Sequence, residues 1–315
     1  MDDMPDSTLP SPQGHPLIAT LAGAALLMLA ALIGPHLIAQ QPLAHLLVGG
    51  AALGLGLWLV ALLVSVRRAP IVWILGSLVL LVAAGLGAGL IAHGQYQTGA
   101  RADASSFAEI EFAPDGAPQL PAGIAGRGPI SRLYAEKVQA EAAEQREFAA
   151  ALGQFGIGNL NSPYLLSQDA HAIANCAAID AIKATAQSQA DKRAARNAVL
   201  ARAIAAASLP DDAKQGIAAL AGAQPGTRGD PLLANQQAML DASKTLCTLL
   251  ARRTWFNDGG FFGFRNGADK AAFDAIGKRR QAIAAEGDAL TKAERARLVE
   301  GRDAVRDALS RSIYG

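Results

Sequence analysis

The sequence predicts an all-α protein: a three-helix transmembrane bundle, a Pro/Gly linker and then a soluble helical bundle of about six or seven helices. Between Ser7 and Arg101 the only charged side chains are Arg67 and Arg68, and most other residues are apolar or glycine. A helix needs about 20 apolar residues to cross a bilayer core, so this block has room for three spans. After Arg101 charged residues return and apolar residues recur at helical spacing, which is typical of a water-soluble bundle.

This change in composition divides the chain into four regions. The first residues are acidic and contain several prolines, which predicts a disordered tail. A stretch rich in Gly, Pro and Ala follows the apolar block, and we expect an extended linker there. The predicted regions are the tail at 1–15, the transmembrane domain at 16–93, the linker at 94–130 and the soluble helical domain at 131–315.

Proline residues separate the three predicted spans, which we place at about 17–38, 43–66 and 71–92. The connections are only a few residues long, so consecutive spans are expected to be antiparallel neighbours. The second and third spans each carry two glycines four positions apart. Such small-residue faces let helix backbones approach closely in lipid, where packing drives association. The glycines expected to pack are Gly50, Gly54, Gly85 and Gly89.

The orientation of the bundle follows from its few basic residues. Arg67 and Arg68 lie in the turn between the second and third spans, whereas Arg101 follows the third span on the opposite side. Cytoplasmic loops carry an excess of Lys and Arg, which predicts a cytoplasmic N-terminus and Arg turn. Three spans then carry the soluble domain to the other side. In a bacterium this means anchoring in the inner membrane with a periplasmic or extracellular domain.

The rest of the sequence predicts mostly helices, and several of them have recognisable start signals. Asp230 followed by Pro231 is an N-cap before a proline at the first helical position. Thr291 with Glu294 matches the capping-box pattern, so we expect two separate helices at the C-terminus. Alternating apolar and acidic residues at 108–112 predict one short strand in the linker. Helices are expected at about 131–152, from 167, at 191–208, around 217–220, from 231 to before 259, at 269–286 and at 291–312.

The only two cysteines, Cys176 and Cys247, fall on the predicted buried faces of two different helices. A disulfide between them would close a loop of roughly 70 residues and stabilise the domain by a few kcal/mol. This interpretation goes with an oxidising compartment, because cytosolic thiols are kept reduced. The alternative is two buried free thiols that act as small hydrophobic side chains.

Residues 255–264 are rich in aromatic side chains and contain three glycines, which we interpret as a loop. One interpretation is that the rings fill the end of an alanine-rich bundle that lacks bulky side chains. The other is an exposed aromatic patch that binds a partner protein or the membrane surface. The candidate partner-binding residues are Trp255, Phe256, Phe261, Phe262 and Phe264.

No motif in the sequence assigns a catalytic residue, a cofactor or a metal ligand. The P-loop, nucleophile-elbow, zincin and dinucleotide-binding patterns are absent from the sequence. A net charge of +1 with interspersed acids and bases argues against nucleic acid as a partner. His36, His45 and His93 fall near one predicted membrane surface, which suggests either a haem or metal site or polar residues at helix ends.

This combination predicts a membrane-anchored accessory or binding protein of the bacterial envelope. The sequence shows no set of catalytic residues, and we expect the partner to be another envelope protein. One alternative is a membrane-bound enzyme or a redox component that uses haem or a metal. A second alternative inverts the topology and makes the helical domain a cytoplasmic-facing scaffold.

Overall fold

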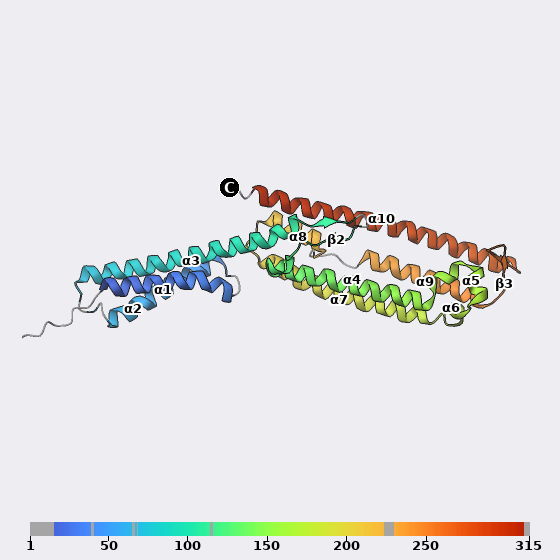
Figure 1. Cartoon of the computed structure of the whole chain (residues 1–315), viewed down its shortest axis with the longest axis horizontal. Helices are drawn as coiled ribbons and strands as arrows, with labels where there is room; N and C mark the ends of the chain where they lie inside the picture. Colours follow the sequence, from blue (N-terminus) through green and yellow to red (C-terminus); the bar gives the residue numbers. More distant parts are fainter. Residues whose placement is uncertain are drawn as a thin grey trace, which may run out of the picture. The chain divides into compact units, whose positions relative to one another are not determined.

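A computed structural model of the chain describes residues 16–38, 41–64, 67, 69–113, 116–223 and 230–311. The predicted tail at 1–15 and Arg68 lie outside these residues. The all-α prediction is confirmed, because the described residues form helices α1 to α10 and four short strands. The helices dominate the structure in Figure 1. The chain divides into two compact units, Met1–Arg101 and Ala102–Gly315. We describe each unit by itself.

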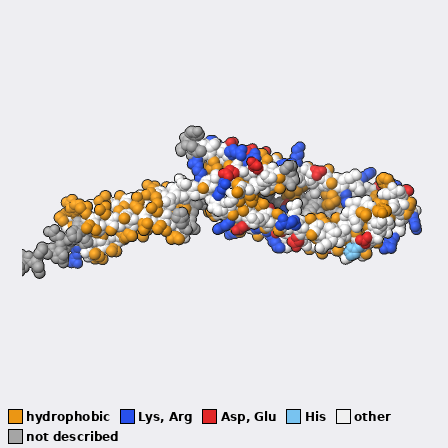
Figure 2. Space-filling view, viewed as in Figure 1, with side chains coloured by type: hydrophobic (Ala, Val, Ile, Leu, Met, Phe, Trp, Pro, Cys, Tyr) orange, Lys and Arg blue, Asp and Glu red, His pale blue; other side chains and the backbone are white. Residues whose placement is uncertain are grey.

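The first unit consists of three long apolar helices: α1 (Pro16–Leu37), α2 (Leu43–Val64) and the part of α3 (Ile71–Ala108) up to Arg101. All three are long and apolar enough to cross a membrane. Large apolar side chains such as Leu21, Val64 and Val72 are exposed on their surface, and Figure 2 shows hydrophobic side chains over this unit. Such exposure of apolar side chains is expected in a lipid bilayer, because exposing the same apolar surface to water costs free energy.

Glycines let α2 and α3 approach until their backbones touch. A Cβ atom added to Gly50 or Gly85 would clash with the carbonyl oxygen of the other residue, and one added to Gly89 would lie 2.7 Å from the Leu46 carbonyl oxygen. Gly54 meets the backbone of Leu81 in the same way. The four glycines that the sequence singles out therefore lie on one contact face between these two helices.

Polar groups and α1 complete the bundle. The indole N–H of Trp58 on α2 donates to the Ile74 carbonyl and to the Ser77 hydroxyl on α3, both at 3.2 Å. Ser77 is 2% exposed, so this bond satisfies a polar group inside the bundle. Leu27 of α1 and Leu81 of α3 belong to a small buried cluster, through which α1 packs on α2 and α3.

Replacing Gly85 with alanine should destabilise this bundle, whereas the same change at Gly87 should not. Gly87 lies on the same helix, but an added Cβ there meets no atom within 4 Å. Forcing a methyl group into a packed interface costs about 1–3 kcal/mol. Thermal unfolding of the full chain in detergent should show a lower midpoint for Gly85→Ala than for Gly87→Ala. Equal midpoints would contradict the close approach of α2 and α3.

The second unit is a helical bundle with two small hairpins. It begins with the last turns of α3, from Ala102, and the hairpin of β1 (Glu111–Phe112) with β2 (Pro118–Gln119). Its remaining elements are the 3-10 helix η2 (Ile124–Gly126), α4 (Pro129–Phe155), the 3-10 helix η3 (Ile157–Asn161), α5 (Pro163–Gln168), α6 (His171–Ala174), α7 (Ala178–Ala206), α8 (Asp211–Ala221), α9 (Pro231–Ala251), β3 (Trp255–Asp258), β4 (Phe261–Phe264) and α10 (Gly267–Arg311).

The long helices of this unit pack in a chain of pairs, α4 on α7, α7 on α9, and α10 on both α8 and α9. A buried core joins the ends of α4, α7 and α9 with the short α5 and α6, and includes Leu160, Ile179 and Leu250. The predicted start signal of α9 is confirmed, because the Asp230 carboxylate accepts from the Leu233 N–H at 3.1 Å. Gly156, at φ +73°, ends α4 as a left-handed C-cap.

The N-terminus of α4 is capped by a side chain from α3. Asp103 is 1% exposed, and its carboxylate accepts from the N–H groups of Ile130 and Ser131, each at 2.8 Å. The Ser131 hydroxyl donates to the same carboxylate. A Cβ added to Gly128 would overlap this carboxylate, so no other side chain fits there. The cap therefore ties the end of α3 into the fold of the second unit.

Several boundaries differ from the prediction. The helices expected from 167 and at 191–208 are instead the short α5 and α6 followed by one helix, α7, and α9 ends at Ala251. Residues 94–108, which we expected in the linker, continue α3, and only the region after Ala108 is irregular. The predicted break before Thr291 is wrong, because α10 runs without interruption from Gly267 to Arg311. The Thr291 hydroxyl donates to the Gly287 carbonyl at 2.9 Å, as a threonine inside a helix does, and Glu294 pairs with Arg297.

Candidate functional site

The two cysteines lie together in a disulfide. Cys176 lies between α6 and α7, and Cys247 lies in α9 and is completely buried. The structure joins their sulfur atoms, with 5.7 Å between the Cα atoms and a sequence separation of 71 residues. Both belong to the core at the end of the bundle, so the bond links the α6–α7 connection covalently to α9.

Removing this bond should destabilise the second unit. Loss of a native disulfide costs about 2–5 kcal/mol in small domains, chiefly because the unfolded chain gains freedom. We expect the Cys176→Ala/Cys247→Ala variant to unfold at a lower denaturant concentration than the oxidised wild type. Reductant should lower the midpoint of the wild type and leave that of the double variant unchanged. A wild type that does not respond to reductant would contradict the bond.

The aromatic segment forms a β-hairpin, so the predicted loop is wrong. β3 and β4 pair antiparallel, with Trp255 opposite Phe264 and Asp258 opposite Phe261. The two-residue connection is Gly259-Gly260, with φ of +60° and +97°. One of the two common two-residue hairpin turns, type I′, needs positive φ at both central positions, which glycine adopts without strain. The glycines that suggested a break in regular structure therefore make the turn between two strands.

The two faces of the hairpin have different environments. Trp255, Phe262 and Phe264 pack on the core, and Phe262 and Phe264 each lie with their ring centroid 5.1 Å from that of Phe273 on α10. Phe256 and Phe261 point away from the core and are 43% and 78% exposed. Three of the rings thus fill the end of the bundle, as the first interpretation expects, and the other two are exposed.

A buried carboxylate holds the base of the hairpin. Asp269, near the start of α10, accepts from the Thr254 hydroxyl at 2.6 Å, the Asn266 amide at 2.8 Å and Arg252 at 3.0 Å. These partners lie just before β3, just after β4 and after α9. The hydrogen bond from Thr254, followed by that from Asn266, lowers the pKa of the Asp269 carboxyl from its usual value.

This lowered pKa makes the hairpin base sensitive to acid. The folded state favours the ionised carboxylate, so its stabilising contribution is present above the unfolded pKa of about 3.9 and is lost as pH falls through the lower folded pKa. Urea unfolding of Asp269→Asn should show a lower midpoint than wild type at pH 6 and a smaller difference near pH 3. Asp258→Asn, at an exposed carboxyl of the same hairpin, is the control. A difference that stays constant over this pH range would refute the assignment.

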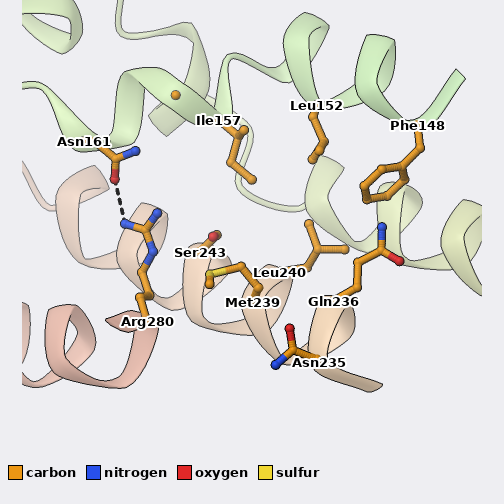
Figure 3. A pocket seen from close by; sticks show the side chains of 11 residues that line it. Phe148, Leu152, Ile157, Asn161, Asn235, Gln236, Met239, Leu240, Ser243 and Arg280 are labelled. Carbon is orange, nitrogen blue, oxygen red and sulfur yellow. Dashed lines mark hydrogen bonds between the residues drawn. The ribbon is translucent and has the colours of Figure 1, made fainter. Parts of the chain in front are cut away.

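A cavity of about 400 Å³ lies beside this core, between α4, η3, α9 and α10 (Figure 3). In Figure 3 Phe148 and Leu152 point into it from α4, and Met239 and Leu240 lie on the opposite wall. Its polar side chains include Ser243 and Arg280. The complete lining is Phe148, Leu152, Ile157, Gly158, Asn161, Asn235, Gln236, Met239, Leu240, Ser243 and Arg280.

Several basic side chains of this unit are paired with carboxylates. Arg196 on α7 makes two bonds to Glu144 on α4, at 2.9 and 2.7 Å, and this hydrogen bonding raises the pKa of its guanidinium. Arg193 lies 3.0 Å from Asp230. These pairs join neighbouring helices.

The remaining residues considered from the sequence are the arginines of the turn and three histidines. Arg67 is exposed, and the side chain of His36 lies outside the described residues. His45 is exposed on α2, and the His93 ring on α3 lies 3.1 Å from the Gln97 amide. Across the described residues, no group of three or more His, Cys, Asp or Glu side chains is arranged to hold a metal ion.

Comparisons with models of protein families, with curated proteins and with solved structures found no match for this chain. The candidate site is therefore built from the contacts of its own residues. It comprises the outer face of the β3–β4 hairpin, with Phe256 and Phe261, and the cavity beside it. Sequence reasoning missed the hairpin, although two short aromatic runs around Gly-Gly are a hairpin signal. It also missed Asp269, whose partners lie 3 to 17 residues away, and Arg280, whose partner Asn161 is 119 residues away.

Proposed function

We propose that this chain is a non-enzymatic binding protein of the bacterial envelope, anchored in the inner membrane with its helical domain on the non-cytoplasmic side. The observation that carries this proposal is the disulfide between Cys176 and Cys247. Disulfides persist in the periplasm and outside the cell and are rare in the cytosol. An odd number of spans, with Arg67 and Arg68 in the turn before the last one, supports the same orientation.

The outer face of the hairpin is the proposed contact surface for another envelope protein. Phe256 and Phe261 are exposed there, while the inner face of the same hairpin is fixed in the core. Asp269 and the pair of Trp255 with Phe262 hold the strands in place, so the two exposed rings are presented on a rigid support. Aromatic side chains are enriched in protein interfaces, and a rigid support lowers the entropic cost of binding.

The orientation is tested with single cysteines in the Cys176→Ala/Cys247→Ala background. Ser167→Cys introduces an exposed thiol in the helical domain, and Ser11→Cys places a cysteine near the start of the chain, before the first apolar helix. A membrane-impermeant maleimide added to intact spheroplasts should label the cysteine at position 167 and not the one at position 11. The reverse pattern would place the domain in the cytoplasm and favour the scaffold alternative.

The contact surface is tested by site-specific photo-crosslinking in cells. A photoreactive amino acid in place of Phe261 should give a discrete adduct that weakens when Phe256→Ser is added. The matched control carries the photoreactive residue in place of Val199, an apolar side chain that is 42% exposed on α7. The same adducts at both positions, or none at position 261, would contradict a partner at the hairpin.

A further inference from the structure

The cavity between α4, η3, α9 and α10 combines an apolar wall with polar groups that lack partners. Phe148, Leu152 and Ile157 form one side, and Met239 and Leu240 lie across from them (Figure 3). Its volume of about 400 Å³ falls within the range of small-molecule sites, which is roughly 300–1,000 Å³. A ligand in this space would therefore contact mostly hydrocarbon.

Among the described residues that line the cavity, Arg280 is the only one with a charged side chain. One N–H of its guanidinium donates to the Asn161 amide oxygen at 2.7 Å, while its Nε is buried with no partner. Within the described part of the chain, no carboxylate forms an ion pair with it, in contrast to Arg193 and Arg196. Burial lowers the pKa of this guanidinium, as expected for a cation whose water has been partly removed.

Ser243 adds a second polar group on the α9 wall. The residue is 1% exposed, and its hydroxyl has no hydrogen-bond partner in the structure. A serine inside a helix often bonds to the carbonyl four residues earlier, but that bond does not form here. Buried polar groups without partners are uncommon in folded proteins, because each forgoes the bonds that it would make with water.

We propose that this cavity binds a medium-chain fatty acid as its carboxylate, with the head group at Arg280 and Ser243 and the chain along Phe148, Leu152 and Leu240. A carboxylate offers two oxygens to the planar guanidinium and accepts a bond from a hydroxyl. One cation balances one carboxylate, whereas a phosphate dianion would require further positive charge. The aliphatic chain matches the apolar lining, where its burial gains about 25 cal/mol per Å².

The cavity is separate from the outer face of the hairpin, so binding of a fatty acid there is independent of the proposed function. Arg280 and Ser243 lie in the cavity, and the exposed rings of Phe256 and Phe261 do not line it. The three apolar helices anchor the chain to lipid, in which free fatty acids dissolve. The cavity can therefore be tested in the purified protein without any knowledge of the protein partner.

The test uses the full chain in phosphatidylcholine nanodiscs and a dodecanoate probe with a diazirine near its methyl end. After irradiation and digestion, mass spectrometry should locate adducts on the segments that carry Phe148, Leu152 or Leu240. Arg280→Gln should lower this labelling about tenfold, because a bond to a charged group is lost, while Ser243→Ala should lower it about threefold. Arg279→Gln, at an exposed neighbouring arginine, should label like wild type.

Two further measurements keep the outcome decisive. Met239→Trp fills the cavity without changing its charge, so it should abolish labelling even if Arg280→Gln folds poorly. Excess unlabelled dodecanoate should compete, while dodecanol and lysophosphatidylglycerol should not. Equal labelling of wild type, Arg280→Gln and Met239→Trp would overturn the proposal. Competition by dodecanol would show that the carboxylate is not recognised, and competition by lysophosphatidylglycerol alone would assign the site to a phospholipid.

Discussion

The arrangement of the second unit depends on the buried carboxylate of Asp103. This carboxylate caps the N-terminus of α4, where unpaired N–H groups and the helix dipole favour a negative charge. The contact continues one turn later, where the buried ring of Phe107 packs against Tyr134 with 5.2 Å between centroids. The cap fixes the position of the N-terminus of α4. Because α4 packs on α7 and α7 packs on α9, the positions of these helices depend on that of α4.

Helix α9 connects the features on which the two proposals rest. Cys247 on this helix forms the disulfide, the carbonyl of Leu250 accepts from the Trp255 indole at 2.9 Å, and Ser243 lies in the cavity wall. Arg252 follows the helix and bonds to Asp269 at the base of the hairpin. The hairpin, the disulfide and the cavity therefore share one rigid element. A substitution that moves α9 would affect all three, which is why the tests rely on matched neighbouring variants.

Sequence reasoning predicts the parts of this structure that local patterns specify. Span length and the absence of charge define the apolar helices, and the spacing of Gly50 with Gly54 selects the face of α2 that meets α3. It fails where a local signal competes with tertiary packing. The capping pattern at Thr291 does not end α10, because the helix continues along α8 and α9 and buries Val305.

The candidate site is less predictable because its polar contacts join residues that are far apart in sequence. Arg280 and Asn161 are 119 residues apart, and nothing near either residue indicates that they meet. The faces of the hairpin follow from strand alternation, but that rule applies only once Gly259-Gly260 is interpreted as a turn. The aromatic composition of the segment therefore indicated an unusual feature without specifying its geometry.

The disulfide also affects how the protein would respond to proteolysis. The segment of the chain that it closes contains all of α7 and α8 and most of α9. A protease that cuts one peptide bond between Cys176 and Cys247 would produce two fragments that remain one covalent molecule. The fragment with the hairpin and α10 would stay attached to the three apolar helices until a reductant released it. A single cleavage in this region would therefore break the backbone without releasing the C-terminal fragment from the membrane anchor.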